Sequence, residues 1–169
     1  AIDATRAQKA IDELSKILRY VLYENDRDFV HLVDETNFLK NYVNLMRIRV
    51  SSNVDVKMNI DIPQDCHACI APMIVISLVE NAFKHGISAS EPSYISIDIK
   101  ASNDKIECEI RNSNFPKTQS DHSGHGIGLK QVAKRLELAY NGNYKWEKWT
   151  DEKEYNSKII IYDTKLCYY

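Results

Sequence analysis

The segment that most constrains the fold is PMIVISLVENAFK, residues Pro72–Lys84, because it is apolar on almost every side. A helix of that composition must be buried, since a surface helix keeps one polar face. Proline is tolerated in the first turn of a helix, and Gly86 suits the position just past its end. We therefore expect a central helix that other elements of the chain cover.

Alternation of apolar and polar residues predicts strands on both sides of this helix, at Val54–Ile62, Tyr94–Lys100 and Lys105–Arg111. Two further strands are expected in the tail, at Tyr144–Trp149 and Lys158–Tyr162, joined by the charged turn 151–154. Ser102–Asp104 is a plausible hairpin turn between the second and third strands. Apolar residues at three- and four-residue steps predict further helices over residues 2–24, Leu32–Arg49 and Ile127–Tyr140.

The order of elements after residue 53, β-α-β-β-α-β-β, predicts an α+β fold. We expect a two-layer α/β sandwich in which helices cover one face of a mixed, mostly antiparallel sheet, with an additional N-terminal helix. The length of 169 residues is consistent with one domain. The chain begins with Ala rather than Met, and we interpret it as a piece of a longer protein.

Composition excludes some classes of protein. The formal net charge of −2 argues against a nucleic-acid binder, which usually carries a basic surplus. The nearly apolar run Cys69–Val79 is far shorter than the roughly 20 residues that span a bilayer. The four cysteines lack the second closely spaced pair of a zinc site, so free thiols in a reducing compartment are expected.

Three of the five glycines fall within Gly124–Gly128, where a polar loop meets a predicted helix. Alternate glycines let the backbone approach a ligand, and a helix N-terminus attracts phosphate. A hinge that binds nothing is the alternative interpretation. The spacing is neither that of a P-loop nor that of a dinucleotide-binding turn.

Two further polar clusters are ambiguous when taken alone. Asn81, Lys84 and His85 share one face at the end of the buried helix, and next to Glu80 they suit Mg²⁺ and phosphate oxygens. An ordinary solvated helix end would have the same composition. Asn112-Ser113-Asn114 follows a predicted strand and either reads a base edge or forms a turn.

Taken in order along the chain, these clusters resemble the ATP-binding domain of the GHKL superfamily, which has the Bergerat fold. The similarity is greatest to sensor histidine kinases of the LytS-like type and covers nearly the whole chain. It rests on four stretches: LSKILRYVLYE, LKNYVNLMRIR, IAPMIVISLVENAFKHGI and GHGIGLKQVAKRLELAY.

The resemblance implies a role for each matching residue. Asn81 would coordinate the Mg²⁺ that bridges the ATP phosphates, and Glu80 would be the catalytic carboxylate that activates the acceptor or orders water. Lys84 and His85 would face the phosphates or the ribose. The remaining nucleotide-binding residues would be Asn112, Asn114, Gly124, Gly126, Gly128 and Leu129. The polar loop 113–125 would be the ATP lid.

The resemblance also implies a division of the chain. Residues 1–25 would be the C-terminal part of a dimerisation helix, and residues 26–169 would be the catalytic domain. The partners would be a response regulator and a second copy of the full-length protein. The location would be the cytoplasmic side of an inner-membrane sensor protein, with the membrane reached only through upstream segments.

The sequence departs from the family pattern in two respects. Asn112 stands where the superfamily usually has the Asp that reads adenine, and the glycines of that box are absent. The phosphoacceptor histidine of the family lies in an N-P-H-F-like stretch upstream of LSKILRY, and none is present, so this piece is not expected to phosphorylate itself. A nucleotide-binding dimerisation scaffold without strong catalysis, and a GHKL ATPase or serine kinase, remain the alternatives.

Overall fold

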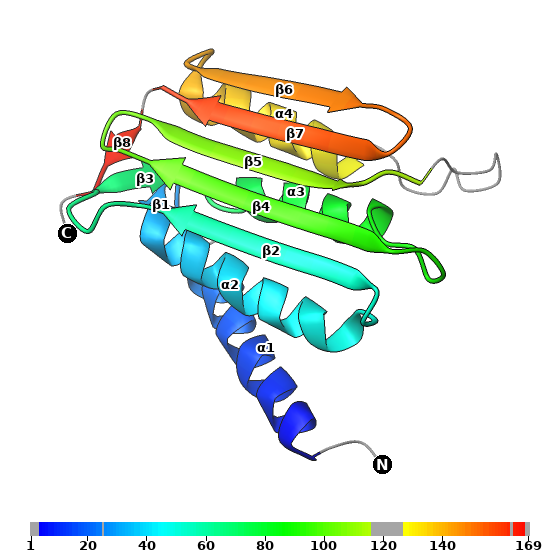
Figure 1. Ribbon diagram of the computed structural model, residues 1–169. Coiled ribbons are helices and arrows are strands. Elements are labelled where there is room, and N and C mark those ends of the chain that lie inside the picture. The colour runs from blue at the N-terminus through cyan, green and yellow to red at the C-terminus, as the bar shows by residue number, and fades with distance from the viewer. Residues whose placement is uncertain (1–3, 25, 116–126, 163, 168–169) are drawn as a thin grey trace.

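The computed structural model describes residues 4–24, 26–115, 127–162 and 164–167, which form four helices and two sheets (Figure 1). The helices are α1 (Ala4–Glu24), α2 (Leu32–Arg49), α3 (Ile74–His85) and α4 (Ile127–Tyr140). The strands are β1 (Val30–His31), β2 (Val54–Asp61), β3 (Ala68–Ile70), β4 (Ser93–Ala101), β5 (Ile106–Ser113), β6 (Tyr144–Thr150), β7 (Glu154–Ile161) and β8 (Lys165–Leu166).

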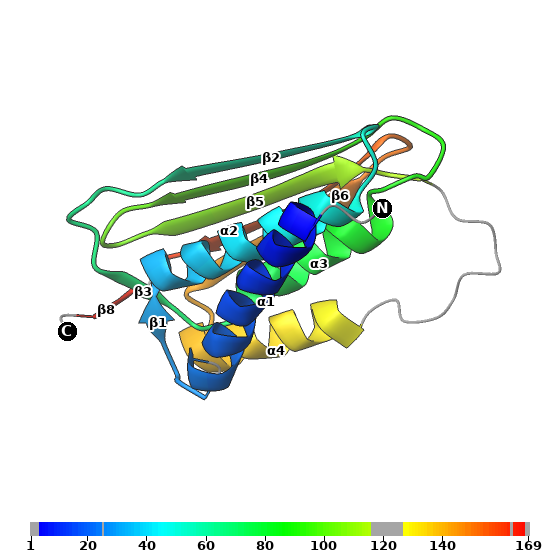
Figure 2. The ribbon, with the colours of Figure 1, turned by 90° about the horizontal axis from the view of Figure 1, so that it is seen from below.

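The larger sheet has the strand order β2-β4-β5-β7-β6. β2 and β4 are parallel, and every other neighbouring pair is antiparallel. The helices lie together on one side of this sheet (Figure 2). The predicted α+β sandwich, with its mixed and mostly antiparallel sheet and its N-terminal helix, is confirmed.

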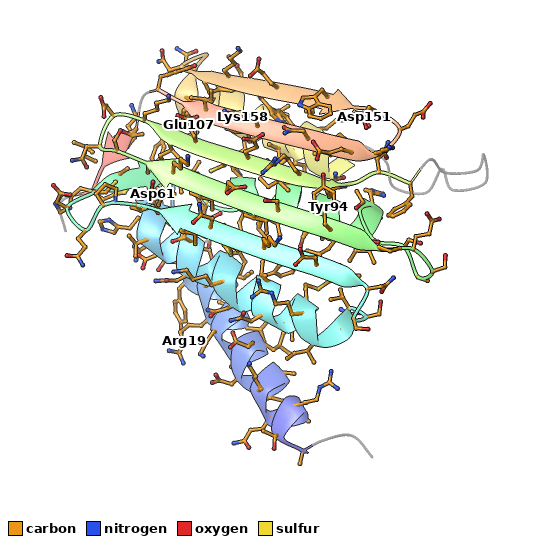
Figure 3. The ribbon with its side chains drawn as sticks, in the orientation of Figure 1. Arg19, Asp61, Tyr94, Glu107, Asp151 and Lys158 are labelled. Atoms are coloured by element: carbon orange, nitrogen blue, oxygen red, sulfur yellow. A yellow bond between two sulfur atoms is a disulfide. The ribbon has the colours of Figure 1, made fainter. Side chains whose placement is uncertain are left out.

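The other face of the large sheet is lined with charged and polar side chains (Figure 3). Lys158 Nζ on β7 lies 3.5 Å from Glu107 Oε2 on β5. Arg111 Nη2 on β5 lies 3.5 Å from Asp98 Oδ2 on β4. These pairs are partly exposed and contribute little to stability. A face of this composition is suited to contact with water. It therefore marks the side of the sheet that none of the described helices covers.

The core lies between the sheet and α3, as the apolar composition of this helix predicts. Its buried members include Ile74, Val75, Leu78, Val79 and Ala82. They pack against the inward-facing isoleucines of the strands, of which Ile97 and Ile99 on β4 are fully buried. α4 packs beside α3, and its Leu136 and Tyr140 complete the same core.

α1 packs along α2 through an aromatic contact. The rings of Tyr20 and Phe38 are stacked with their centroids 4.3 Å apart. Four large aliphatic side chains on α1 are exposed: Ile11, Leu14, Leu18 and Leu22. Part of the apolar stripe of α1 is therefore used within the chain and part of it faces outward.

Three short strands form a second sheet, in the order β1-β3-β8, that the alternation in the sequence does not predict. Cys69 on β3 is joined by a disulfide to Cys167, which follows β8. The expectation that all four cysteines are free thiols is therefore wrong for this pair, because the fold brings together residues 98 positions apart. Cys66 and Cys108 are free.

Within the described residues, each helix is too short or too polar to span a membrane.

Candidate functional site

The C-terminal end of α3 lies directly against the end of β5. A Cβ atom added at Gly86 would stand 2.6 Å from the Asn112 Cβ and 2.7 Å from the backbone oxygen of Ala82. No larger residue fits there unless the two elements move apart. Glycine at position 86 therefore permits the close approach that brings the polar residues of α3 next to Asn112.

Asn112 is a buried polar residue with one unused acceptor. Its side chain is on the core face of β5, and the residue is 2% exposed. The amide nitrogen donates to the backbone oxygen of Ser113 at 2.8 Å. The side-chain oxygen has no hydrogen-bond partner among the described residues, which is a costly arrangement for a buried acceptor. Such an oxygen is suited to a donor supplied by a ligand.

The last turns of α3 supply the polar groups predicted for the phosphate side. Asn81 and His85 are half-buried, and Lys84 is exposed. The carboxyl of Glu80 has a raised pKa because it is partly desolvated. These residues lie at helical spacing on a rigid, buried helix, so their relative positions are fixed by the core beneath them.

Glu80 also lines a cleft of about 1000 Å³ between α3, α4 and the loop 26–29. Ser77 and Met73 line the same wall, and Gln131 and Arg135 on α4 face them. Among the predicted site residues that the structure describes, only Glu80 lines it. In Figures 1 and 2 the end of α3, the start of α4 and the end of β5 lie at the same side of the molecule.

The remaining predicted site residues lie just after β5, on α4 or outside the described residues. The Asn114 amide donates to the Asp151 backbone oxygen at 2.6 Å and to Thr150 Oγ1 at 3.1 Å, so it fastens the β6–β7 turn to the end of β5. Gly128, in the first turn of α4, has open space around it, and Leu129 is half-buried against the core. Gly124 and Gly126 lie outside the described residues.

A second buried polar cluster, which sequence reasoning missed, lies at the start of α3. Glu35 on α2 is 0% exposed, accepts a hydrogen bond from the Tyr20 hydroxyl of α1, and lies 3.5 Å from the backbone nitrogen of Met73. Burial raises the pKa of this carboxyl to about 7. The available signal was its spacing, because residue 35 falls on the same face of α2 as Leu32 and Phe38.

The chain matches the family model described as "Histidine kinase" over residues 1–54. It is 27% identical over 143 residues to the sensor histidine kinase YpdA of Escherichia coli K12, covering 79% of this chain and 25% of YpdA. It is 28% identical over 144 residues to the sensor histidine kinase BtsS of the same strain, covering 84% of this chain and 25% of BtsS. The family model and both relatives show that the chain is similar to sensor histidine kinases. The two relatives are consistent with the LytS-like type, and the chain spans about a quarter of their length.

Solved structures of histidine kinases share the fold. The catalytic domain of the histidine kinase ThkA matches with a TM-score of 0.56 and 18% identity, covering 81% of this chain and 97% of that domain. The histidine kinase domain of the blue-light activated kinase EL346 from Erythrobacter litoralis matches with a TM-score of 0.55 and 8% identity, covering 94% of this chain and 79% of that domain. The fold of this chain is therefore that of a histidine kinase catalytic domain.

Proposed function

We propose that residues 26–169 are the ATP-binding catalytic domain of a two-component sensor histidine kinase. In this proposal the domain transfers the γ-phosphoryl group of ATP to a histidine outside this chain, and a response regulator then receives it. Residues 1–25 would be the end of the dimerisation helix. The proposal combines the family of the chain with the chemistry of the site at the end of α3.

The observation that carries the proposal is the unpartnered oxygen of Asn112. It is buried at the end of a central strand, beside the glycine that lets α3 approach. The exocyclic amino group of adenine is a donor of the kind that this oxygen lacks. An amide in place of the usual carboxylate keeps the acceptor and loses the charge, so we expect recognition with a weaker hydrogen bond.

The phosphate side of the site would be formed by the last turns of α3. Asn81 supplies an amide oxygen, a ligand type that Mg²⁺ accepts, and Glu80 supplies a neighbouring carboxyl. Mg²⁺ bound with ATP would neutralise charge on the phosphates. Lys84 extends from the same helix end and adds a positive charge there. The Glu80 carboxyl, whose pKa is raised, is the proton acceptor we assign to the imidazole that approaches from outside the domain.

The exposed stripe on α1 supports the proposed dimerisation role. Ile11, Leu14, Leu18 and Leu22 are between 46% and 71% exposed and follow one another at three- and four-residue steps. A second copy of the same helix would bury such a stripe. Tyr20, on another side of α1, remains packed on α2 and keeps the helix attached to the catalytic domain.

One observation favours a second candidate function. Asn112 lacks the charge that the superfamily usually places at this position, which favours a nucleotide-binding scaffold that transfers phosphate slowly. Both candidates bind ATP, and they differ only in turnover.

Titration of the chain with a fluorescent ATP analogue, with and without Mg²⁺, tests the shared step. We expect saturable binding, strengthened by Mg²⁺ and weakened roughly tenfold in Asn112→Ala through loss of one buried hydrogen bond. Asn112→Asp restores the usual acid and should bind at least as tightly as the natural chain. Asn59→Ala, on the exposed side of β2, is the matched control and should leave affinity unchanged. Absence of saturable binding at nucleotide concentrations on the order of 1 mM would refute the proposal.

A further inference from the structure

The small sheet β1-β3-β8 brings three metal-ligating side chains to one of its faces. His31 on β1 stands directly opposite Cys69 on β3, and Cys69 stands opposite Lys165 on β8. Directly opposed residues share a face, and so do residues two positions apart on one strand. Cys167, two positions after Lys165, therefore points to the same side as Cys69 and His31. Its backbone N–H donates to the His67 oxygen at 3.0 Å and continues the pairing.

The donor atoms of His31, Cys69 and Cys167 all lie within 4.8 Å of one another. Cys69 is fully buried, whereas His31 and Cys167 are half-buried, so the group lies at the surface of the small sheet with one member in the core. The His31 side chain makes no capping hydrogen bond to α2, although the residue occupies the N-cap position. Two sulfurs and one imidazole nitrogen form a donor set that suits Zn²⁺ and similar thiophilic cations.

We propose that His31, Cys69 and Cys167 form a binding site for a thiophilic divalent cation, Zn²⁺ in the first place, when the Cys69–Cys167 disulfide is reduced. A dithiol reductant would supply two electrons and two protons to the disulfide, and it would itself become a disulfide. The cation then displaces the two thiol protons, and the two thiolates balance its charge. Neutral imidazole is the third ligand, and water fills the fourth position of a tetrahedral ion.

The separation of the two cysteine Cα atoms, 6.0 Å, allows both states without a change of fold. Either state ties the C-terminal strand β8 to β3. β3 in turn leads through Ala71 and Pro72 into α3, the helix that carries the candidate site. The bound cation and the disulfide exclude each other, because both use the sulfurs of Cys69 and Cys167. None of the three ligands belongs to the proposed nucleotide site.

Metal titration of the whole chain tests the proposal. The chain is reduced with a phosphine, which is removed under exclusion of oxygen before any metal is added. It is then titrated with Zn²⁺ against a chromophoric chelator, and with Co²⁺ in the absence of oxygen. We expect one ion per chain and a thiolate-to-cobalt charge-transfer band. The oxidised chain, with its disulfide intact, should bind no ion at this site.

Single substitutions separate a metal site from a simple disulfide. His31→Ala should weaken Zn²⁺ binding by at least about 100-fold, because loss of a direct ligand exceeds the 10–100-fold effect of outer-shell changes, yet it should leave disulfide formation intact. Cys167→Ser should abolish both. Because Cys69 is fully buried and Cys69→Ser risks misfolding, Cys167→Ser near the chain end carries this part of the test.

Cys66→Ser is the matched control, since Cys66 is a free, half-buried thiol three positions from Cys69 and outside the group. It should bind Zn²⁺ as the natural chain does. The proposal is overturned if His31→Ala binds Zn²⁺ normally, if the oxidised chain binds it equally well, or if Cys66→Ser abolishes binding while His31→Ala does not.

Discussion

The two ends of α3 each enclose a buried polar side chain, and the two side chains differ in what surrounds them. At the start of the helix, the chain itself surrounds Glu35 with a hydroxyl from α1, a backbone N–H from Met73 and the positive charge of Arg135 on α4. At the end of the helix, Asn112 has its amide donor satisfied and its acceptor unused.

The difference lies in what completes each cluster. Groups from α1, the start of α3 and α4 converge on Glu35, so this carboxyl on α2 joins α1 to the helices beneath the large sheet. The Asn112 oxygen has no such partner among the described residues and lies next to a helix end rich in polar groups. Glu35 Oε1 is also without a hydrogen-bond partner among the described residues, so an unused acceptor alone does not separate the two sites. They differ in that distant parts of the chain converge on Glu35, which indicates a structural junction, whereas Asn112 bonds only to the neighbouring residue of its own strand, which leaves its oxygen to a ligand.

The largest effect is expected from Glu35→Gln and depends on pH. Burial raises the pKa of Glu35 in the folded chain to about 7, above its ordinary value of 4.5. Between these values the folded state binds the proton more tightly than the unfolded state, so stability falls as pH rises through this window. The Gln variant does not titrate. The natural chain should lose about 3 kcal/mol relative to it between pH 4 and pH 8, an order-of-magnitude figure.

Denaturant unfolding at a series of pH values measures this difference. Glu91→Gln, on an exposed loop, is the matched control and should follow the natural chain throughout. Parallel stability curves for the natural chain and Glu35→Gln would mean that Glu35 does not change its protonation in this range.

The second effect tests the other end of α3. In Gly86→Ala, the new Cβ would lie 2.6 Å from the Asn112 Cβ and close to a backbone oxygen, so α3 and β5 must separate. We expect a loss of about 2 kcal/mol of stability, together with weaker nucleotide binding.

Gly128→Ala is the control for this substitution, because nothing lies within 4 Å of the added Cβ and the position is helical. There alanine should stabilise the chain by up to about 1 kcal/mol. Equal effects of the two substitutions on unfolding would contradict the close packing inferred at Gly86.

Local periodicity predicts most of the architecture. The bounds expected for α2 and α4 agree with the structure, and the predicted strands of the large sheet are present, although β7 begins at Glu154 rather than Lys158. β1, β3 and β8 escape prediction because strands of two or three residues carry no measurable alternation. Their existence depends on pairing between distant segments, and so does the disulfide that the cysteine spacing failed to indicate.

The candidate site was predictable to a similar degree. Helical spacing places Asn81, Lys84 and His85 together, and the structure adds their approach to Asn112. The amide bonds of Asn114 to the β6–β7 turn could not be foreseen, because that turn is about 37 residues further along the chain. The sequence order of motifs indicated the family, whereas contacts between distant elements decide which polar side chains remain available.

The smallest effect is expected from Tyr20→Phe, which removes only the hydroxyl that α1 donates to Glu35. That hydrogen bond lowers the pKa of Glu35 against the larger effect of burial, so its loss should raise the pKa further. At pH 8, where the carboxylate is charged, the variant should be about 1–2 kcal/mol less stable than the natural chain. At pH 5, where Glu35 is protonated, the loss should be smaller. Tyr23→Phe, on the exposed side of α1, is the control. A loss in Tyr20→Phe that does not vary with pH would show that the hydroxyl contributes independently of the charge on Glu35. No loss at any pH would show that Tyr20 holds α1 by stacking on Phe38 alone, without the participation of Glu35.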